Sequence, residues 1–112
     1  MMNNRLNAYR TMWLIVLYDL PTETKKHRKA ASRFRKDIMA YGFQMFQFSA
    51  YIRHVMSREQ ADAYKRKVKK ILPSEGFIGI IEITDKQFGN MELFHQLIKK
   101  ENPQAPVQLQ LF

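Results

Sequence analysis

Residues 12–20 read MWLIVLYDL, an almost continuous run of apolar side chains that reaches the acid Asp19 near its end. Branched and aromatic residues in so short a run are typical of a central β-strand covered on both faces. Pro21 then ends the strand, and Thr22 is the N-cap expected for a following helix. This strand is the element around which we expect the others to assemble.

Two amphipathic helices are predicted after it. The first runs up to Gly42, which is placed to end it, and its apolar residues recur at helical spacing: Ala30, Ala31, Phe34, Ile38 and Tyr41. The second begins with the capping-box pair Ser57 and Gln60 and stops before Pro73, with apolar residues at Ala61, Tyr64, Val68 and Ile71.

The remaining segments are predicted to be extended. Residues 42–54 form either two short strands or one sharply bent strand, and residues 77–84, FIGIIEIT, form a well-marked strand. Residues 91–97 could be strand or helix, and we favour a strand. The tail at residues 107–112, VQLQLF, alternates strictly and needs a sheet edge to pair with, its own or that of a partner.

This order of elements predicts an α+β protein with a ferredoxin-like βαββαβ sandwich and an additional C-terminal strand. Residues 1–11 are expected to be a flexible N-terminal arm, and residues 12–97 the ferredoxin-like domain. Residues 98–112 are expected to be a tail whose terminal strand pairs at a dimer edge.

The composition excludes several classes of protein. The chain has 112 residues, 46% of them apolar, and no cysteine, so disulfides and thiolate metal sites are excluded and a cytoplasmic location is expected. Its longest apolar run is far shorter than the roughly 20 residues that cross a bilayer, so we expect a soluble protein without membrane contact.

Basic residues are concentrated in the middle of the chain. The net charge is +9, and residues 21–70 carry 14 Lys and Arg against four Asp and Glu. Such a segment favours an acidic partner over a merely solvated surface. The residues expected to contact a nucleic-acid backbone are Lys25, Lys26, Arg28, Lys29, Arg33, Lys36, Lys65, Arg66 and Lys69.

Asp19 is the strongest candidate for chemistry, because a carboxylate at a strand end is held by rigid backbone yet can reach solvent. It could hold Mg²⁺, weakly in one chain and better where two chains share a site, or it could simply cap the turn that follows. Glu82 merits attention only if it is buried. The other acids of the middle segment are expected to form salt bridges, the three histidines show no metal-ligand spacing, and Ser49 has no activating neighbour in its own segment.

Three stretches carry a family resemblance: MWLIVLYDLPTETKK (residues 12–26), RKAASRFRK (residues 28–36) and GFQMFQFSAYIRH (residues 42–54). Together they resemble the small CRISPR-associated protein of the spacer-acquisition machinery, the dimeric partner of the CRISPR integrase, in the form that accompanies type II systems. The resemblance extends to about residue 94. Ala50 and His27 depart mildly from the family pattern, which has a β-branched residue and an acid there.

The resemblance implies a ferredoxin-like protomer and a two-fold homodimer in which Asp19 faces its mate and binds Mg²⁺ between the subunits. Asp19 would then be both the catalytic and the metal-binding residue, with Tyr18 and Ser49 near the site. It further implies a metal-dependent endonuclease acting on RNA or double-stranded DNA, and a scaffold that holds a DNA duplex between two integrase dimers.

Two functions therefore stay open. The protein is either a non-catalytic scaffold for duplex DNA or a Mg²⁺-dependent phosphodiesterase that uses Asp19 from both subunits. We favour the scaffold, because the basic segment is extensive and each chain offers a single candidate catalytic residue. An RNase toxin of the same fold, unrelated to defence, is a distant third reading.

Overall fold

A computed structural model of the chain describes residues 12–94. In chain order its elements are β1 (Met12–Asp19), α2 (Lys25–Ala40), β2 (Gln44–Gln47), β3 (Ala50–Val55), α3 (Arg58–Lys70), β4 (Phe77–Thr84) and α4 (Asp85–Gly89). The N-terminal arm and the terminal strand predicted from the sequence lie outside the described residues.

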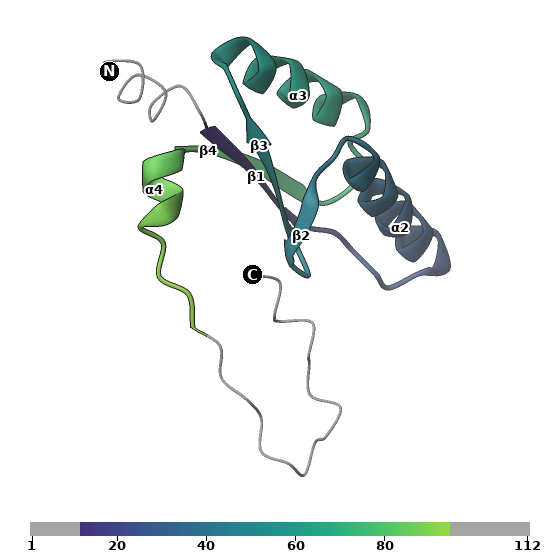
Figure 1. Cartoon of the computed structure of the whole chain (residues 1–112). Coiled ribbons are helices and arrows are strands. Elements are labelled where there is room, and N and C mark those ends of the chain that lie inside the picture. The colour runs from purple at the N-terminus through teal and green to yellow at the C-terminus, as the bar shows by residue number, and fades with distance from the viewer. Residues whose placement is uncertain (1–11, 95–112) are drawn as a thin grey trace, which may run out of the picture.

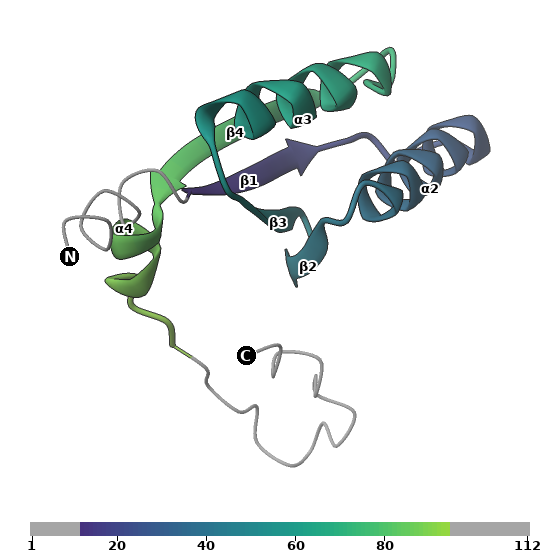
Figure 2. The same cartoon turned by 45° about the horizontal axis from the view of Figure 1, so that its top comes forward.

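The four strands form one sheet in the order β2-β3-β1-β4, and every neighbouring pair is antiparallel. α2 and α3 cover one face of this sheet, whereas α4 lies against the opposite face (Figure 1 and Figure 2). This is the α+β, ferredoxin-like arrangement that the sequence predicted. No helix within residues 12–94 is long and apolar enough to cross a bilayer.

β1 is central, as predicted, and its side chains alternate between the two faces. Met12, Leu14 and Val16 point towards the helices and are buried in a core that includes Phe34, Ile38, Tyr51, Val55 and Val68. The opposite face, which we call the open face, receives Trp13, Ile15, Leu17 and Asp19 from β1 and their sheet partners from β3 and β4. The composition of β1 predicted a strand covered on both faces. The described residues leave part of its open face uncovered, because Leu17 is 41% exposed there.

The first helix begins two residues later than predicted. Thr24, not Thr22, is its N-cap, and the Thr24 hydroxyl accepts the backbone N–H of His27 at 3.0 Å. The chain uses the intervening residues to turn away from the strand after Pro21, and the Arg28 side chain donates to the carbonyl of Thr22 at 3.0 Å. Both threonines can act as N-caps, so composition alone could not choose between them.

Residues 42–54 form two strands, which settles the alternative left open by the sequence. β2 and β3 are joined by a turn at Phe48 and Ser49, and the pairing is irregular between Met45 and Gln47. Phe48 is 67% exposed at this turn, whereas Ala50, the first residue of β3, is 4% exposed.

The region after β4 differs from the prediction. Residues 91–94 are not a strand, and the rest of the expected segment lies outside the described residues. Instead, Thr84 and Gln87 form a reciprocal capping box that starts the short helix α4. A local cap therefore bends the chain out of the sheet directly after β4.

The Arg53 side chain links three elements. From β3 its guanidinium donates to the carbonyl of Tyr41 at the end of α2 (2.9 Å), to the carbonyl of His54 (2.7 Å) and to the hydroxyl of Tyr64 on α3 (2.7 Å). The guanidinium also lies 4.0 Å from the centre of the Tyr64 ring. Gly42 has a φ of +90°, and a Cβ there would lie 3.2 Å from the Arg53 Nε. Arg53 thus fixes the end of α2, the middle of α3 and β3 relative to one another.

We expect Arg53→Met to lower the free energy of unfolding by about 2–4 kcal/mol, because two carbonyls and a hydroxyl lose their partly buried donor. Urea denaturation measures the change. Arg66→Met, at an exposed position of α3, is the matched control. It should change the free energy of unfolding by less than about 0.5 kcal/mol. Equal effects of the two substitutions would contradict this role of Arg53.

Candidate functional site

Asp19 is the last residue of β1 and lies exposed on the open face, opposite Phe77 of β4. It lines a shallow hollow of about 410 Å³ that also involves Gln47 from the end of β2 and Ser49 from the turn between β2 and β3. The backbone N–H of Tyr18 donates to the Ser49 carbonyl at 3.1 Å and holds this turn against the end of β1. The structure thus brings together Asp19 and Ser49, two of the residues named from the sequence, with Gln47 beside them.

The loop before β4 packs against the backbone of Asp19. Gly76 has a φ of +112°, and a Cβ there would lie 2.9 Å from the carbonyl oxygen of Asp19 and 2.5 Å from the side chain of Leu20. Only a glycine allows so close an approach in this backbone conformation. The position of Asp19 therefore depends on a residue that is more than fifty positions away in the sequence.

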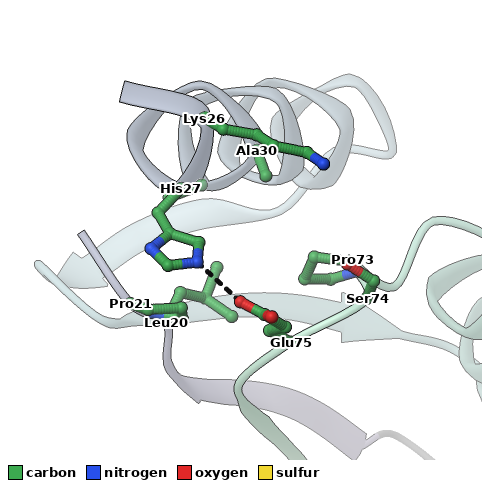
Figure 3. A pocket seen from close by; sticks show the side chains of 9 residues that line it. Leu20, Pro21, Lys26, His27, Ala30, Pro73, Ser74 and Glu75 are labelled. Carbon is green, nitrogen blue, oxygen red and sulfur yellow. Dashed lines mark ion pairs between the residues drawn. The ribbon is translucent and has the colours of Figure 1, made fainter. Parts of the chain in front are cut away.

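His27 and Glu75 fasten the same loop to the start of α2. The His27 Nε2 lies 2.6 Å from a carboxylate oxygen of Glu75, across a pocket of about 140 Å³ whose wall includes Leu20 and Pro21 (Figure 3). The pair thus connects the segment after Asp19 with the segment before β4. His27 therefore helps to hold the loop before β4 in place.

The donor atoms in the Asp19 hollow suit a hard cation in kind but not in number. Carboxylate, amide and hydroxyl oxygens are the ligands that Mg²⁺ prefers, but with one carboxylate per chain the hollow can hold the ion only weakly. Within residues 12–94 there is no group of three or more His, Asp or Glu that could hold a metal ion. A site built from two copies of the hollow would double the ligands.

Asp19 does not cap the helix that follows, because Thr24 provides that cap. The carboxylate is left at the exposed end of the strand.

Tyr18 borders the hollow, but its side chain points to the helix-covered face. Its hydroxyl donates to the Phe48 carbonyl at 3.1 Å, and its ring packs edge-on against Phe34 and stacks on Tyr51. Burial, followed by the charge and the hydrogen bond of Tyr51, raises the pKa of Tyr18 to about 12. Tyr18 therefore anchors the turn beside Asp19 and remains a neutral phenol at ordinary pH.

The basic residues named from the sequence separate into two groups. Lys26, Lys29 and Arg33 lie along one side of α2 and, together with Lys70 from the end of α3, line a groove of about 490 Å³ that we call the basic groove. Asp37 is an acidic residue at the same groove. Lys70 was not among the residues named from the sequence, and only the meeting of the two helix ends reveals it. The others that lie exposed on the two helices are Lys25, Lys36, Arg66 and Lys69.

Two of the named basic residues are bound within the protein. Arg28 donates to backbone carbonyls of the β1–α2 loop, and Lys65 forms an ion pair with Glu82. Glu82 is 20% exposed and also pairs with Arg58 at 2.9 Å, so it connects α3 to β4. The partial burial of Glu82 is thus explained by its cationic partners, and no catalytic role is needed for it.

Comparison with known proteins gives a consistent result. The chain matches the family described as "CRISPR associated protein Cas2" over residues 12–91. It is 52% identical over 108 residues to the CRISPR-associated endoribonuclease Cas2 of Flavobacterium psychrophilum, covering 96% of this chain and 94% of that protein. The protein of the same name from Parvibaculum lavamentivorans is 43% identical over 101 residues, covering 90% of this chain and 100% of its own length.

A solved structure described as "Crystal structure of cas2" shares the fold. The TM-score is 0.56 at 21% sequence identity, over 80% of this chain and 91% of the other. At this identity the similarity concerns the arrangement of helices and strands.

The raised pKa of Tyr18 predicts a distinct alkaline titration. Because the folded protein holds this proton up to about pH 12, against an ordinary value of 10.0, the associated stabilisation is complete below pH 10 and is lost as the pH rises towards 12. Absorbance of tyrosinate should show a late step near pH 12, and Tyr18→Phe should remove that step. A titration curve that Tyr18→Phe leaves unchanged, in a protein that is still folded by circular dichroism, would contradict the assignment.

Proposed function

Because the chain belongs to the CRISPR-associated Cas2 family, we propose that it is a cytoplasmic CRISPR adaptation protein whose main role is that of a dimeric scaffold. In this role it binds the phosphates of duplex DNA and bridges two integrase dimers during spacer integration. The observation that carries the proposal is the basic groove, which gathers four cationic side chains from two helices. The Asp19 hollow, in contrast, contains a single carboxylate per chain.

The open face supports a homodimer. Leu17 and Ile81 are 41% and 42% exposed there, and Phe77 is 82% exposed. None of the described strand residues that point to this face is a Lys or Arg, although the chain carries a net charge of +9. Two copies can therefore bring these faces together and bury apolar surface without juxtaposing their positive charges.

The helix layer supports binding to nucleic acid. Contacts from Lys and Arg side chains to phosphates depend on charge and carry no sequence information. The basic groove and the exposed cations beside it lie on the helices, on the side of the sheet away from the open face. A homodimer formed through the open faces would leave both basic grooves accessible to a duplex.

The second candidate function is that of a Mg²⁺-dependent endonuclease acting on RNA or double-stranded DNA. The curated relatives bear the name endoribonuclease, and the oxygen ligands of the Asp19 hollow suit Mg²⁺ in kind. When bound, the ion would polarise the phosphodiester and activate water. Asp19 from each subunit would hold it, while the hydroxyl of Ser49 and the amide of Gln47 could donate to phosphate oxygens.

We place the scaffold first because the Asp19 hollow lacks an evident proton-transfer group among residues 12–94. His27 is engaged with Glu75, and His54 lies at the opposite end of β3. A general acid or base must lie within hydrogen-bond reach of the reacting group. The basic groove is complete within one chain, whereas the metal site needs a second copy.

Duplex DNA binding tests the scaffold. We expect affinity to be nearly independent of sequence, and the double variant Lys29→Ala/Arg33→Ala to lower the slope of log K against log salt by roughly two units, one for each phosphate that is no longer neutralised. Arg28→Ala/Lys65→Ala removes the same charge from residues that are bound within the protein, and it should change the slope less. Fluorescence anisotropy across a salt series measures both. Equal slopes in all three proteins would show that the basic groove is only a solvated surface.

Asp19→Ala separates the two functions. Cleavage that depends on Mg²⁺ should fall by orders of magnitude, because a metal site that loses its carboxylates loses several kcal/mol of transition-state stabilisation. Duplex binding should be retained, since the basic groove is intact. Spacer integration with the partner integrase should also persist. Loss of integration in a variant that still dimerises and binds DNA would contradict the scaffold as the main role.

A further inference from the structure

The cavity of about 140 Å³ beside the start of α2, which we call the α2 pocket, has the lining of a ligand site (Figure 3). Its wall is mostly apolar, and a few polar side chains converge on it, as in most small-molecule sites. The volume is below the roughly 300 Å³ at which pockets for drug-sized ligands begin, so a single ring system suits it. Ala30 and Ala31 interrupt the basic run of α2 and leave the space that longer side chains would fill.

Both loops that border the α2 pocket are held in place by contacts within the protein. The Arg28 side chain donates to two backbone carbonyls of the β1–α2 loop, at 3.0 and 3.3 Å. The contact of 2.6 Å between His27 and Glu75 ties the loop before β4 to α2. Pro21 and Pro73 stiffen the two loops further, because the proline ring fixes φ. A cavity built in this way binds a ligand without a large cost of ordering.

The α2 pocket adjoins the basic groove. Lys26, Ala30 and Pro73 line both of them. A ring system in the pocket that carries a phosphate could therefore place that phosphate beside Lys29 and Arg33 in the groove. A nucleobase joined through its sugar to a phosphate has this composition.

The polar groups of the α2 pocket differ in what they offer to a base. Glu75 and Lys26 lie on opposite sides of the cavity, one on the loop before β4 and the other on α2 (Figure 3). A carboxylate can accept about four hydrogen bonds, so the contact with His27 leaves acceptor capacity on Glu75. Lys26 and the Ser74 hydroxyl can donate. The pocket thus pairs an anionic acceptor on one side with donors on the others.

Guanine matches this arrangement better than the other bases. Its Watson–Crick edge places two N–H donors, N1 and N2, side by side, and one carboxylate can accept both. Its O6 and N7 are acceptors that lysine commonly binds. Adenine and cytosine present one amino donor beside a ring nitrogen that is an acceptor, and a carboxylate repels that nitrogen.

We propose that the α2 pocket binds an unpaired guanine base whose phosphate lies in the basic groove. Within a duplex the same edge of guanine is engaged with cytosine, so the pocket reads only a base that is unpaired or has left the stack. Binding to the interior of a duplex stays independent of sequence. The inference rests on the proposed binding of nucleic acid by the basic groove and adds recognition of a strand end.

Duplexes with unpaired ends test the inference. One duplex carries an unpaired guanosine at its 3′ ends and another at its 5′ ends, and each is compared with the same duplex ending in unpaired cytidine. By fluorescence anisotropy, we expect the guanosine-ended duplex of at least one polarity to bind roughly tenfold more tightly. Equal affinities for guanosine and cytidine ends in both polarities would overturn the inference.

Two substitutions locate the preference. Ala30→Leu fills the α2 pocket without a change of charge, and Glu75→Gln replaces one acceptor by a donor of the same shape. Each should abolish most of the tenfold preference for guanosine ends. The matched controls are Ala40→Leu, at an exposed position at the end of α2, and Glu23→Gln, an exposed acid of the β1–α2 loop outside the pocket. Both controls should keep the preference, and circular dichroism checks that all four variants are folded.

The outcomes separate this inference from the proposed function. A preference that survives Ala30→Leu in a folded protein overturns the pocket. Titration with guanosine 5′-monophosphate followed by NMR gives a readout that needs no variant: the amides of Ala31 and Ser74 should shift, and cytidine 5′-monophosphate should shift them less. Equal shifts with both nucleotides also overturn the pocket. Absence of salt-dependent binding to every duplex, blunt ones included, overturns the proposed function instead.

Discussion

The guanidinium of Arg53 is the contact on which the arrangement of the helix layer depends. It satisfies two backbone carbonyls and a tyrosine hydroxyl from three elements. A partly buried charge is tolerated only when its donors are used, and here all three nitrogens of the planar group have acceptors. Gly42, next to this guanidinium, has a φ of +90°, which favours glycine, and a Cβ there would lie 3.2 Å from the Arg53 Nε.

The sheet divides the molecule into two surfaces with different chemistry. Alternation along β1 sends Leu14 and Val16 into the core and Leu17 and Asp19 to the open face. The helices that cover the core carry the basic groove on their outer side, while the open face combines apolar residues with one carboxylate. Binding of phosphates and pairing of subunits can therefore occur on opposite sides without competition.

Local patterns predicted the elements well, and non-local contacts account for what they missed. The apolar run of β1, the periodicity of α2 and α3 and the stop at Gly42 were readable within a few residues. The turn between β2 and β3 consists of Phe48 and Ser49 and contains no Gly, Pro, Asn or Asp, so the sequence could not divide residues 42–54. The short helix α4 was missed although Thr84 and Gln87 carry its capping box.

The candidate site was predictable only where it depends on local sequence. Asp19 could be identified from its place at a strand end, whereas Gln47 and Ser49 reach it through the fold. The engagement of Lys65 with Glu82, seventeen positions away, could not be seen from a count of charges. Nor could Lys70, which joins the basic groove only because the end of α3 lies beside α2.

The separation of charge across the sheet also gives the protomer an electric dipole moment. Cations project from the helix layer, and the opposite face presents a carboxylate among hydrocarbon side chains. In the field of a polyanion such a molecule experiences a torque that turns its helices forward before any contact is made. Encounters are thus biased towards the productive orientation, and raising the ionic strength shortens the range over which this alignment acts.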